Sequence, residues 1–152
     1  MGSSPIGRAS MTFPTHILLG AIIGKVTGNY ALAVGVSVAP DLDHLKSYFK
    51  SGVIKSPQTF WKTITDGNDP YGDQRGILHN LLFFVCASII LIFLSPIIVL
   101  CWFGHLVLDA LDSSDYWPFY PNKKINIRGP IRYASIQELI FFSALLVVYL
   151  II

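Results

Sequence analysis

Pro40-Asp41-Leu42-Asp43-His44 places two carboxylates and an imidazole within a few residues, directly after a long apolar run. A second stretch, Gly104-His105-Leu106-Val107-Leu108-Asp109, ends another apolar run with a histidine and an aspartate four residues apart. Because residues i and i+4 share a helix face, His105 and Asp109 are expected to point the same way. We expect both stretches to lie at one edge of a helix bundle, with their polar side chains converging.

The apolar residues of this 152-residue chain form long blocks instead of being spread evenly. Hydrophobic residues make up 53% of the chain and charged residues only 13%, whereas soluble domains carry about 25% charged residues. The mean hydropathy is +0.56, and the apolar blocks cover 17–23, 30–39, 77–111 and 136–152. This pattern predicts an all-α, polytopic membrane helix bundle with about five membrane segments in short hairpins. The net charge of +2 is too small to indicate a nucleic-acid partner.

The chain is long enough for one domain. Residues 1–11 are mostly small and polar, and are interpreted as a disordered tail or an added leader. Residues 12–152 are interpreted as a single membrane-embedded domain, in which 45–75 and 112–135 are polar connections. The two cysteines, Cys86 and Cys101, lie inside an apolar block and are expected to be buried hydrophobic residues.

The segments Thr12–Val26 and Tyr30–Ala39 are compatible with either one broken span or a hairpin of two short helices. A helix of about 13 residues rises only about 20 Å, less than the hydrocarbon core, which favours one span. Gly28-Asn29 beside Lys25 is instead typical of a turn. We predict the hairpin, because it also brings His16 to the edge that carries the Pro40–His44 stretch.

The remaining boundaries follow from prolines and caps. Ser95-Pro96 is expected to divide the long block into helices Ile77–Leu94 and Ile97–Leu111. The last helix is expected to begin at Ser135, with Ser135 as its N-cap and Glu138 in its first turn. The connection 45–75 mixes lysines with aromatic residues, and this composition fits equally a segment on a lipid headgroup surface or a solvated loop.

The cations indicate the topology. In the five-segment arrangement, Lys25 alone of the 11 lysines and arginines lies on the face opposite the polar connections. Cytoplasmic loops carry the excess of lysine and arginine. We therefore predict a multi-pass inner-membrane protein with a cytoplasmic N-terminus, cytoplasmic connections and a C-terminus on the other side.

This topology brings all four histidines to one face, each near an acid. Each histidine or aspartate alone is more often a structural residue than a ligand, but their joint position favours a metal site. Carboxylates at the edge of hydrocarbon are costly unless they are paired or functional. Mixed imidazole and carboxylate ligands suit Zn²⁺ best, with Mn²⁺ or Fe²⁺ as alternatives.

The pattern also resembles a known family. His16, Pro40-Asp-Leu-Asp-His44, Arg75-Gly-Ile-Leu-His79, His105-x-x-x-Asp109 and Glu138 together look like the YdjM family (DUF457) of membrane-bound metal-dependent hydrolases. The chain departs from that pattern at Gln74, where the family often has histidine, and at Asp112, where it often has threonine. The order of ligands is loosely similar to zinc-dependent phospholipase C, an analogy that suggests a lipid phosphate ester.

The leading hypothesis is thus a metal-dependent hydrolase at the cytoplasmic membrane interface, acting on a phospholipid or a lipid-linked phosphate ester. The expected metal ligands are His16, Asp43, His44, His79, His105 and Asp109. Asp41 is expected to support or bridge the ligands, Glu138 to be a ligand or general base, and Arg75 to hold an anionic group or pair with a nearby aspartate. The alternative is a non-enzymatic membrane protein with a structural or sensory metal site. A transporter is disfavoured, because the acids gather at one edge instead of mid-depth.

Overall fold

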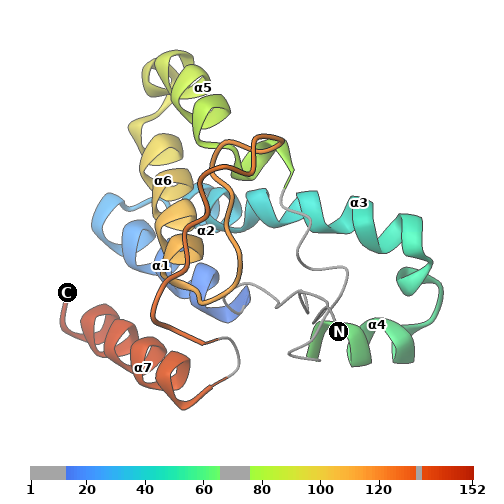
Figure 1. The fold of residues 1–152 in the computed structure, drawn as a ribbon. Helices are drawn as coiled ribbons and strands as arrows, with labels where there is room; N and C mark the ends of the chain where they lie inside the picture. Colours follow the sequence, from blue (N-terminus) through green and yellow to red (C-terminus); the bar gives the residue numbers. More distant parts are fainter. Residues whose placement is uncertain (1–12, 66–75, 133–134) are drawn as a thin grey trace.

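A computed structural model describes residues 13–65, 76–132 and 135–152 (Figure 1). This described part is helical, and its only β-type pairings are two isolated bridges. The prediction of an all-α fold is therefore confirmed. Among the described residues, no helix is both long enough and apolar enough to cross a membrane. The predicted tail, residues 1–11, lies outside the described residues.

Helices α1 (Phe13–Thr27) and α2 (Tyr30–Val38) form the predicted hairpin. Gly28 adopts a left-handed φ of 74° at the turn, and the side chain of Asn29 caps α2 by accepting from Leu32 N. The two helices touch closely at Gly20, where a Cβ atom would lie 2.6 Å from Val34 Cα. The absence of a side chain at Gly20 therefore allows the hairpin to close.

Helix α2 ends at Val38, next to the predicted end at Ala39, and the chain stays helical around Pro40. The proline lies in a short 3-10 helix, η1 (Ala39–Asp41), and α3 (Leu42–Ser51) begins directly after it. A proline in the first turn has no amide that the helix needs, so the chain continues in helical geometry. Asp43 and His44 consequently lie in the first turn of α3.

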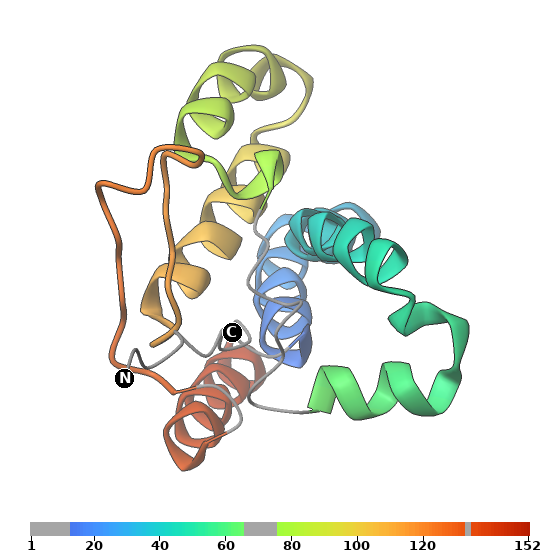
Figure 2. The same cartoon turned by 45° about the vertical axis from the view of Figure 1, so that its right-hand side comes forward.

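The described part of the first polar connection, for which the sequence left two interpretations, is largely helical. After α3 the chain turns at Gly52, which has a φ of 75°, and continues through η2 (Val53–Lys55) into α4 (Pro57–Thr65). Figures 1 and 2 show these helices extending away from the rest of the bundle.

Helix α6 (Pro96–Leu111) contacts α1, α2 and α5 (Leu81–Leu94). The break at Ser95-Pro96 is as predicted. His79 was expected in the first turn of a helix, but it ends the separate 3-10 turn η3 (Ile77–His79), and Asn80 caps α5 by accepting from Phe83 N. Phe84, Trp102 and Leu106 form a buried apolar cluster between α5 and α6.

The second connection folds back along itself through the bridges Asp112–Ile131 and Tyr116–Ile127. Helix α7 (Ile136–Ile151) follows it and packs on α1. As predicted, Ser135 caps α7, accepting from the amide of Glu138. At the other end of α7, Lys25 Nζ donates to Tyr149 O over 2.8 Å.

Candidate metal centre

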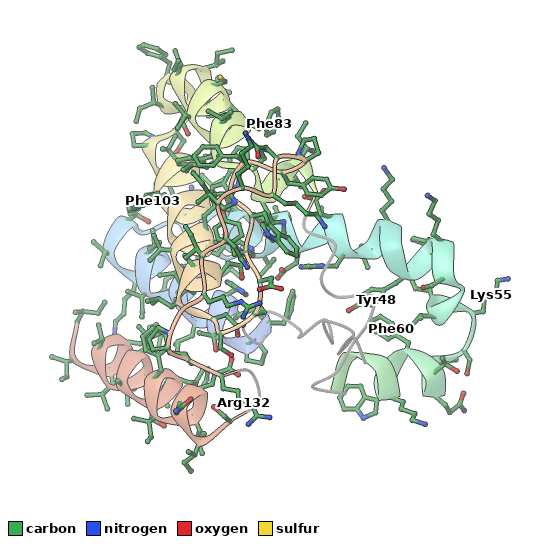
Figure 3. The ribbon with its side chains drawn as sticks, in the orientation of Figure 1. Tyr48, Lys55, Phe60, Phe83, Phe103 and Arg132 are labelled. Atoms are coloured by element: carbon green, nitrogen blue, oxygen red, sulfur yellow. The ribbon has the colours of Figure 1, made fainter. Side chains whose placement is uncertain are left out.

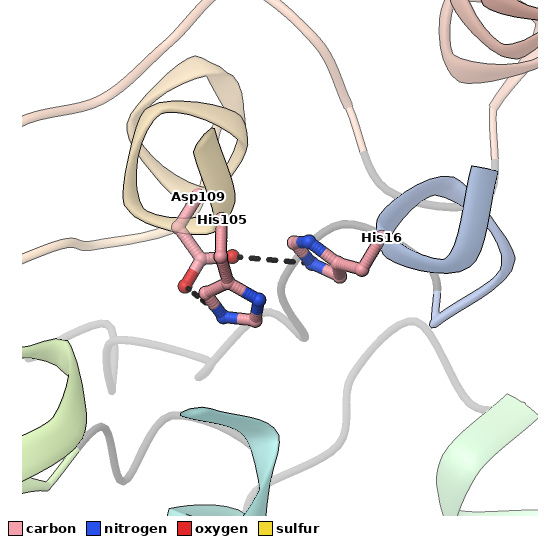
Figure 4. A group of neighbouring side chains, drawn as sticks. All are labelled: His16, His105 and Asp109. Atoms are coloured by element: carbon pink, nitrogen blue, oxygen red, sulfur yellow. Dashed lines mark ion pairs between the residues drawn. The ribbon is translucent and has the colours of Figure 1, made fainter. Parts of the chain in front are cut away.

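Three elements that are far apart in sequence bring histidines together. His16 comes from α1, His79 from η3 and His105 from α6, which also carries Asp109 one turn later. Figure 4 shows His16 reaching across from α1 toward His105 and Asp109. All four side chains are buried, and His16, His105 and Asp109 are close enough together to hold one metal ion.

Glycines set the spacing between the helices that carry these groups. A Cβ at Gly104, next to His105, would lie 2.8 Å from a methyl group of Leu19. Gly20, whose Cβ would meet the backbone of Val34, lets α1 approach α2, while Gly104 leaves room for the Leu19 side chain between α1 and α6. Small residues at helix interfaces allow such close contact.

The hydrogen bond made by His105 determines which of its nitrogens faces the site. Nδ1 lies 2.7 Å from the carbonyl oxygen of Ser37. A carbonyl only accepts, so Nδ1 carries the proton and, in the neutral ring, Nε2 carries the lone pair. This tautomer is assigned from the hydrogen-bond partner.

His79 is oriented in the same way by Asp43. Its Nδ1 lies 3.3 Å from Asp43 Oδ2, and that same oxygen accepts the Leu78 amide over 2.7 Å. Burial raises the pKa of the Asp43 carboxyl, but the hydrogen bonds from His79 and Leu78 outweigh it and bring the pKa below its usual value. A carboxylate on the outer nitrogen of a histidine is the arrangement that orients metal-binding imidazoles.

Gly76 makes room for this carboxylate. A Cβ at Gly76 would lie 2.8 Å from both Cγ and Oδ1 of Asp43. The close approach of the Asp43 carboxylate thus explains why position 76 is a glycine, which the sequence alone did not reveal.

Three acceptor atoms converge as a result. His79 Nε2 lies 3.2 Å from His105 Nε2 and 3.2 Å from Asp109 Oδ2, and His105 Nε2 lies 3.6 Å from the same Asp109 oxygen. With bonds of about 2.0–2.1 Å, the ligand atoms of a tetrahedral Zn²⁺ lie about 3.3 Å apart. The three atoms therefore have the chemistry and the mutual spacing of a metal-binding set.

Two further groups flank these three atoms. His16 Nε2 lies 3.6 Å from Asp109 Oδ1, and the His16 ring stacks on that of His105 with centroids 4.0 Å apart. On another side, Asp41 Oδ1 lies 3.7 Å from His105 Nε2, and Asp41, His79 and His105 form a second group that can hold a metal ion. Both groups contain His105, and its Nε2 lone pair can bind only one ion. The two groups are therefore two ways of holding the same ion, not two separate sites.

The other residues proposed from the sequence lie around this centre. His44 Nε2 lies 3.7 Å from Asp41 Oδ1, and the His44 ring lies near that of His79, with centroids 5.2 Å apart. Glu138 is buried and accepts a hydrogen bond from Thr15, the neighbour of His16, over 3.2 Å. Asp112, where the chain departs from the family pattern, accepts from Ser114 N with its Oδ1. Arg75 and Gln74 lie outside the described residues.

Two supporting groups were missed from the sequence. The carbonyl of Ser37 sets the tautomer of His105, and the Tyr116 hydroxyl donates to the carbonyl of His79 over 2.9 Å. A backbone carbonyl gives no sequence signal, and Tyr116 is one of several aromatic residues in its stretch. Only the fold distinguishes them.

Comparison with known protein families gives a match. A family model described as YdjM inner membrane protein matches residues 11–152. No curated protein matches the chain, and no solved structure does.

Proposed function

Because the chain belongs to the YdjM family of inner membrane proteins, we propose that it is a membrane-bound, metal-dependent hydrolase working at the cytoplasmic face of that membrane. The observation that carries the proposal is the convergence of His79 Nε2, His105 Nε2 and Asp109 Oδ2 within 3.2–3.6 Å. Nδ1 of His79 and Nδ1 of His105 each face an acceptor and therefore carry the proton in the neutral rings. The two Nε2 atoms and the Asp109 carboxylate then direct only lone pairs toward one another. A proton on one ring relieves part of this repulsion, whereas a divalent cation satisfies all three atoms.

The proposed ligands are His79, His105 and Asp109, completed by His16 on one side and Asp41 on the other. Zn²⁺ fits this donor set best, and Mn²⁺ or Fe²⁺ fits it next. For Asp43 and His44, predicted from the sequence to be ligands, the contacts support a different role, and we propose that they orient His79 and Asp41.

A divalent cation held by these residues would supply Lewis acidity and would lower the pKa of a bound water. Asp41 marks the side from which substrate and water reach the centre, because its side chain is 18% exposed while those of His16 and Asp109 are fully buried. Glu138 is the proposed general base, held by Thr15 to receive the proton that the attacking water loses. Arg75 is proposed to bind the anionic part of the substrate.

The proposed substrate is a phospholipid or a lipid-linked phosphate ester. The membrane location of the family supports a lipid, and a cationic guanidinium at Arg75 supports a phosphate. The proposed topology is multi-pass, with the N-terminus cytoplasmic and the C-terminus opposite. The position of Lys25 supports this topology. Lys25 bonds the carbonyl of Tyr149 in the last turn of α7, whereas Glu138, in the first turn of α7, lies at the opposite end near the candidate centre.

A hydrolysis screen tests the proposal. The full chain, reconstituted with Zn²⁺ or Mn²⁺ in nanodiscs, is assayed for release of phosphate or phosphorylated headgroups from lipid phosphomonoesters and diesters. We expect turnover that requires the metal and that falls about a hundredfold or more in Glu138→Gln, with metal content unchanged. Turnover that is equal in wild type and His105→Ala would refute the proposed centre.

A structural or sensory metal site is the second candidate, and the burial of the centre favours it. His16, His79, His105 and Asp109 are almost entirely inaccessible, as in closed structural sites. Co²⁺ substitution separates the two candidates. An absorption spectrum that shifts on adding inorganic phosphate indicates an open coordination position, whereas an unchanged spectrum together with no turnover favours the structural site.

A further inference from the structure

Residues 42–65 form an arm, here called the α3–α4 arm, that leaves the bundle at the metal centre. Helix α3 begins beside η1 and η3, and α4 is reached through η2, which packs on both helices. Figures 1 and 2 show α3 running outward and α4 folding back beneath it.

The arm buries a small apolar core of its own. Tyr48 of α3 and Phe60 of α4 meet edge to face with ring centroids 6.0 Å apart, and Val53 is buried at the turn. Figure 3 shows Tyr48 and Phe60 between the two helices and Lys55 at the outer tip. The inner faces of α3 and α4 are therefore already used, and the outer faces remain for other contacts.

The outer face of α3 is apolar. Leu42, Leu45 and Phe49 recur at spacings of three and four, so they share one helix face. Leu42 is 58% exposed and Phe49 is 68% exposed. On α4, Trp61 is 67% exposed. Large apolar side chains exposed on one face of a helix are costly in water and indicate a covered surface.

Beyond Asp43 in the first turn of α3, the charges on the arm are of one sign. Lysines stand at four exposed positions of the arm, and no acid occurs anywhere from Leu45 to Thr65. The four are Lys46, Lys50, Lys55 and Lys62. An apolar stripe bordered by lysines matches an anionic bilayer surface, which offers acyl chains beneath and phosphates above.

We propose that the α3–α4 arm lies on the anionic cytoplasmic surface of the membrane, with Leu42, Leu45 and Phe49 inserted and the lysines on lipid phosphates. A lipid surface is favoured over a protein partner because the family is membrane-resident, so the bilayer is always beside the arm. The inference stands independently of metal binding and of hydrolysis. Docking would hold the start of α3, and with it Asp43 and His44, against the headgroups.

Cysteine accessibility tests this placement in the full chain. Phe49→Cys is compared with Ser51→Cys, an exposed position about 200° around the same helix. The background carries Cys86→Ser, while the buried thiol of Cys101 is retained. Reaction with a membrane-impermeant maleimide is timed in nanodiscs of phosphatidylcholine, with and without phosphatidylglycerol.

We expect phosphatidylglycerol to slow modification at position 49 about tenfold, with little change at position 51. Replacing the four lysines by glutamine should remove most of this protection, since each lysine near an anionic surface contributes about fivefold in affinity. Equal rates at the two positions in anionic discs would overturn the proposal. The proposal would also be overturned if position 49 were protected equally without phosphatidylglycerol, or were still protected after the four lysines are replaced by glutamine. In either case a protein contact or a purely apolar contact would cover the face.

Discussion

Replacing Asp43 by asparagine isolates the orienting role that the structure gives this carboxylate. Asp43 Oδ2 faces His79 Nδ1 at 3.3 Å and accepts the Leu78 amide at 2.7 Å. Asparagine has nearly the same shape, and its amide oxygen can keep both contacts. The substitution therefore removes the negative charge and leaves the packing around Gly76 almost unchanged.

The expected magnitude follows from these two contacts. A hydrogen bond to a charged group contributes about 1.5–3 kcal/mol, and a neutral one about 1 kcal/mol. The 2.7 Å contact with the Leu78 amide stabilises the backbone, and only the 3.3 Å contact with Nδ1 acts on the His79 ring. We therefore expect the interaction that orients His79 to weaken by about 1–2 kcal/mol. This corresponds to metal binding about tenfold weaker, within the range known for groups that orient metal ligands.

Competition with a calibrated fluorescent Zn²⁺ chelator at fixed pH measures this change on the purified full chain. His105→Ala removes a ligand itself and should weaken binding about a hundredfold or more. Asp115→Asn is the matched control, because Asp115 pairs with Arg128 and Asn126 in the second connection. Circular dichroism confirms that each variant keeps its helix content.

Two results would refute the reasoning. If Asp43→Asn binds Zn²⁺ as tightly as the wild type, the carboxylate does not orient His79. If it loses as much affinity as His105→Ala, Asp43 is itself a ligand, as the sequence suggested, and the geometry has been misread.

Three further substitutions test the frame around the centre, each with a matched control. Gly20→Ala should cost about 1–3 kcal/mol of stability in thermal unfolding, because its Cβ would meet Val34 Cα at 2.6 Å. Gly35→Ala should cost little, since a Cβ at position 35 would meet no neighbouring atom within 4 Å, and equal losses in the two variants would contradict the close helix contact at Gly20. Tyr116→Phe should cost about 1–2 kcal/mol and weaken Zn²⁺ binding several-fold, because the hydroxyl holds the His79 carbonyl, while Tyr120→Phe on an exposed ring should leave binding unchanged. Ser135→Ala should cost about 1 kcal/mol through the lost cap of α7, and Ser143→Ala, on the exposed face of the same helix, should be nearly neutral; the reverse order would contradict the assigned cap.

Local signals in the sequence predicted much of the fold. Gly28-Asn29 and Ser95-Pro96 mark breaks that depend on backbone chemistry alone, so both were found. The four-residue spacing of His105 and Asp109 likewise predicted their shared face. Pro40 marked the end of α2 but did not reveal the helix that follows, since a proline is also tolerated in the first turn of the next helix.

Long-range contacts explain what the sequence did not reveal. The sequence left two interpretations of the α3–α4 arm, a segment on a headgroup surface or a solvated loop, because the packing of Tyr48 on Phe60 cannot be read from residue types. The contact of Asp43 with His79 Nδ1 left no signal either, because it depends on the path of the chain between them, and that Asp43 is a ligand stays a prediction. The carbonyl of Ser37 fixes the tautomer of His105 from 68 residues away and leaves no trace in residue type.

The metal content of the full chain, purified from membranes without added chelator, tests the central claim most directly. We predict about one divalent transition-metal ion per wild-type chain, lost in His105→Ala and in Asp109→Asn but retained in Asp115→Asn. A wild-type chain that carries no stoichiometric metal, and takes up neither Zn²⁺ nor Mn²⁺ nor Fe²⁺ from buffered solution, would contradict the account.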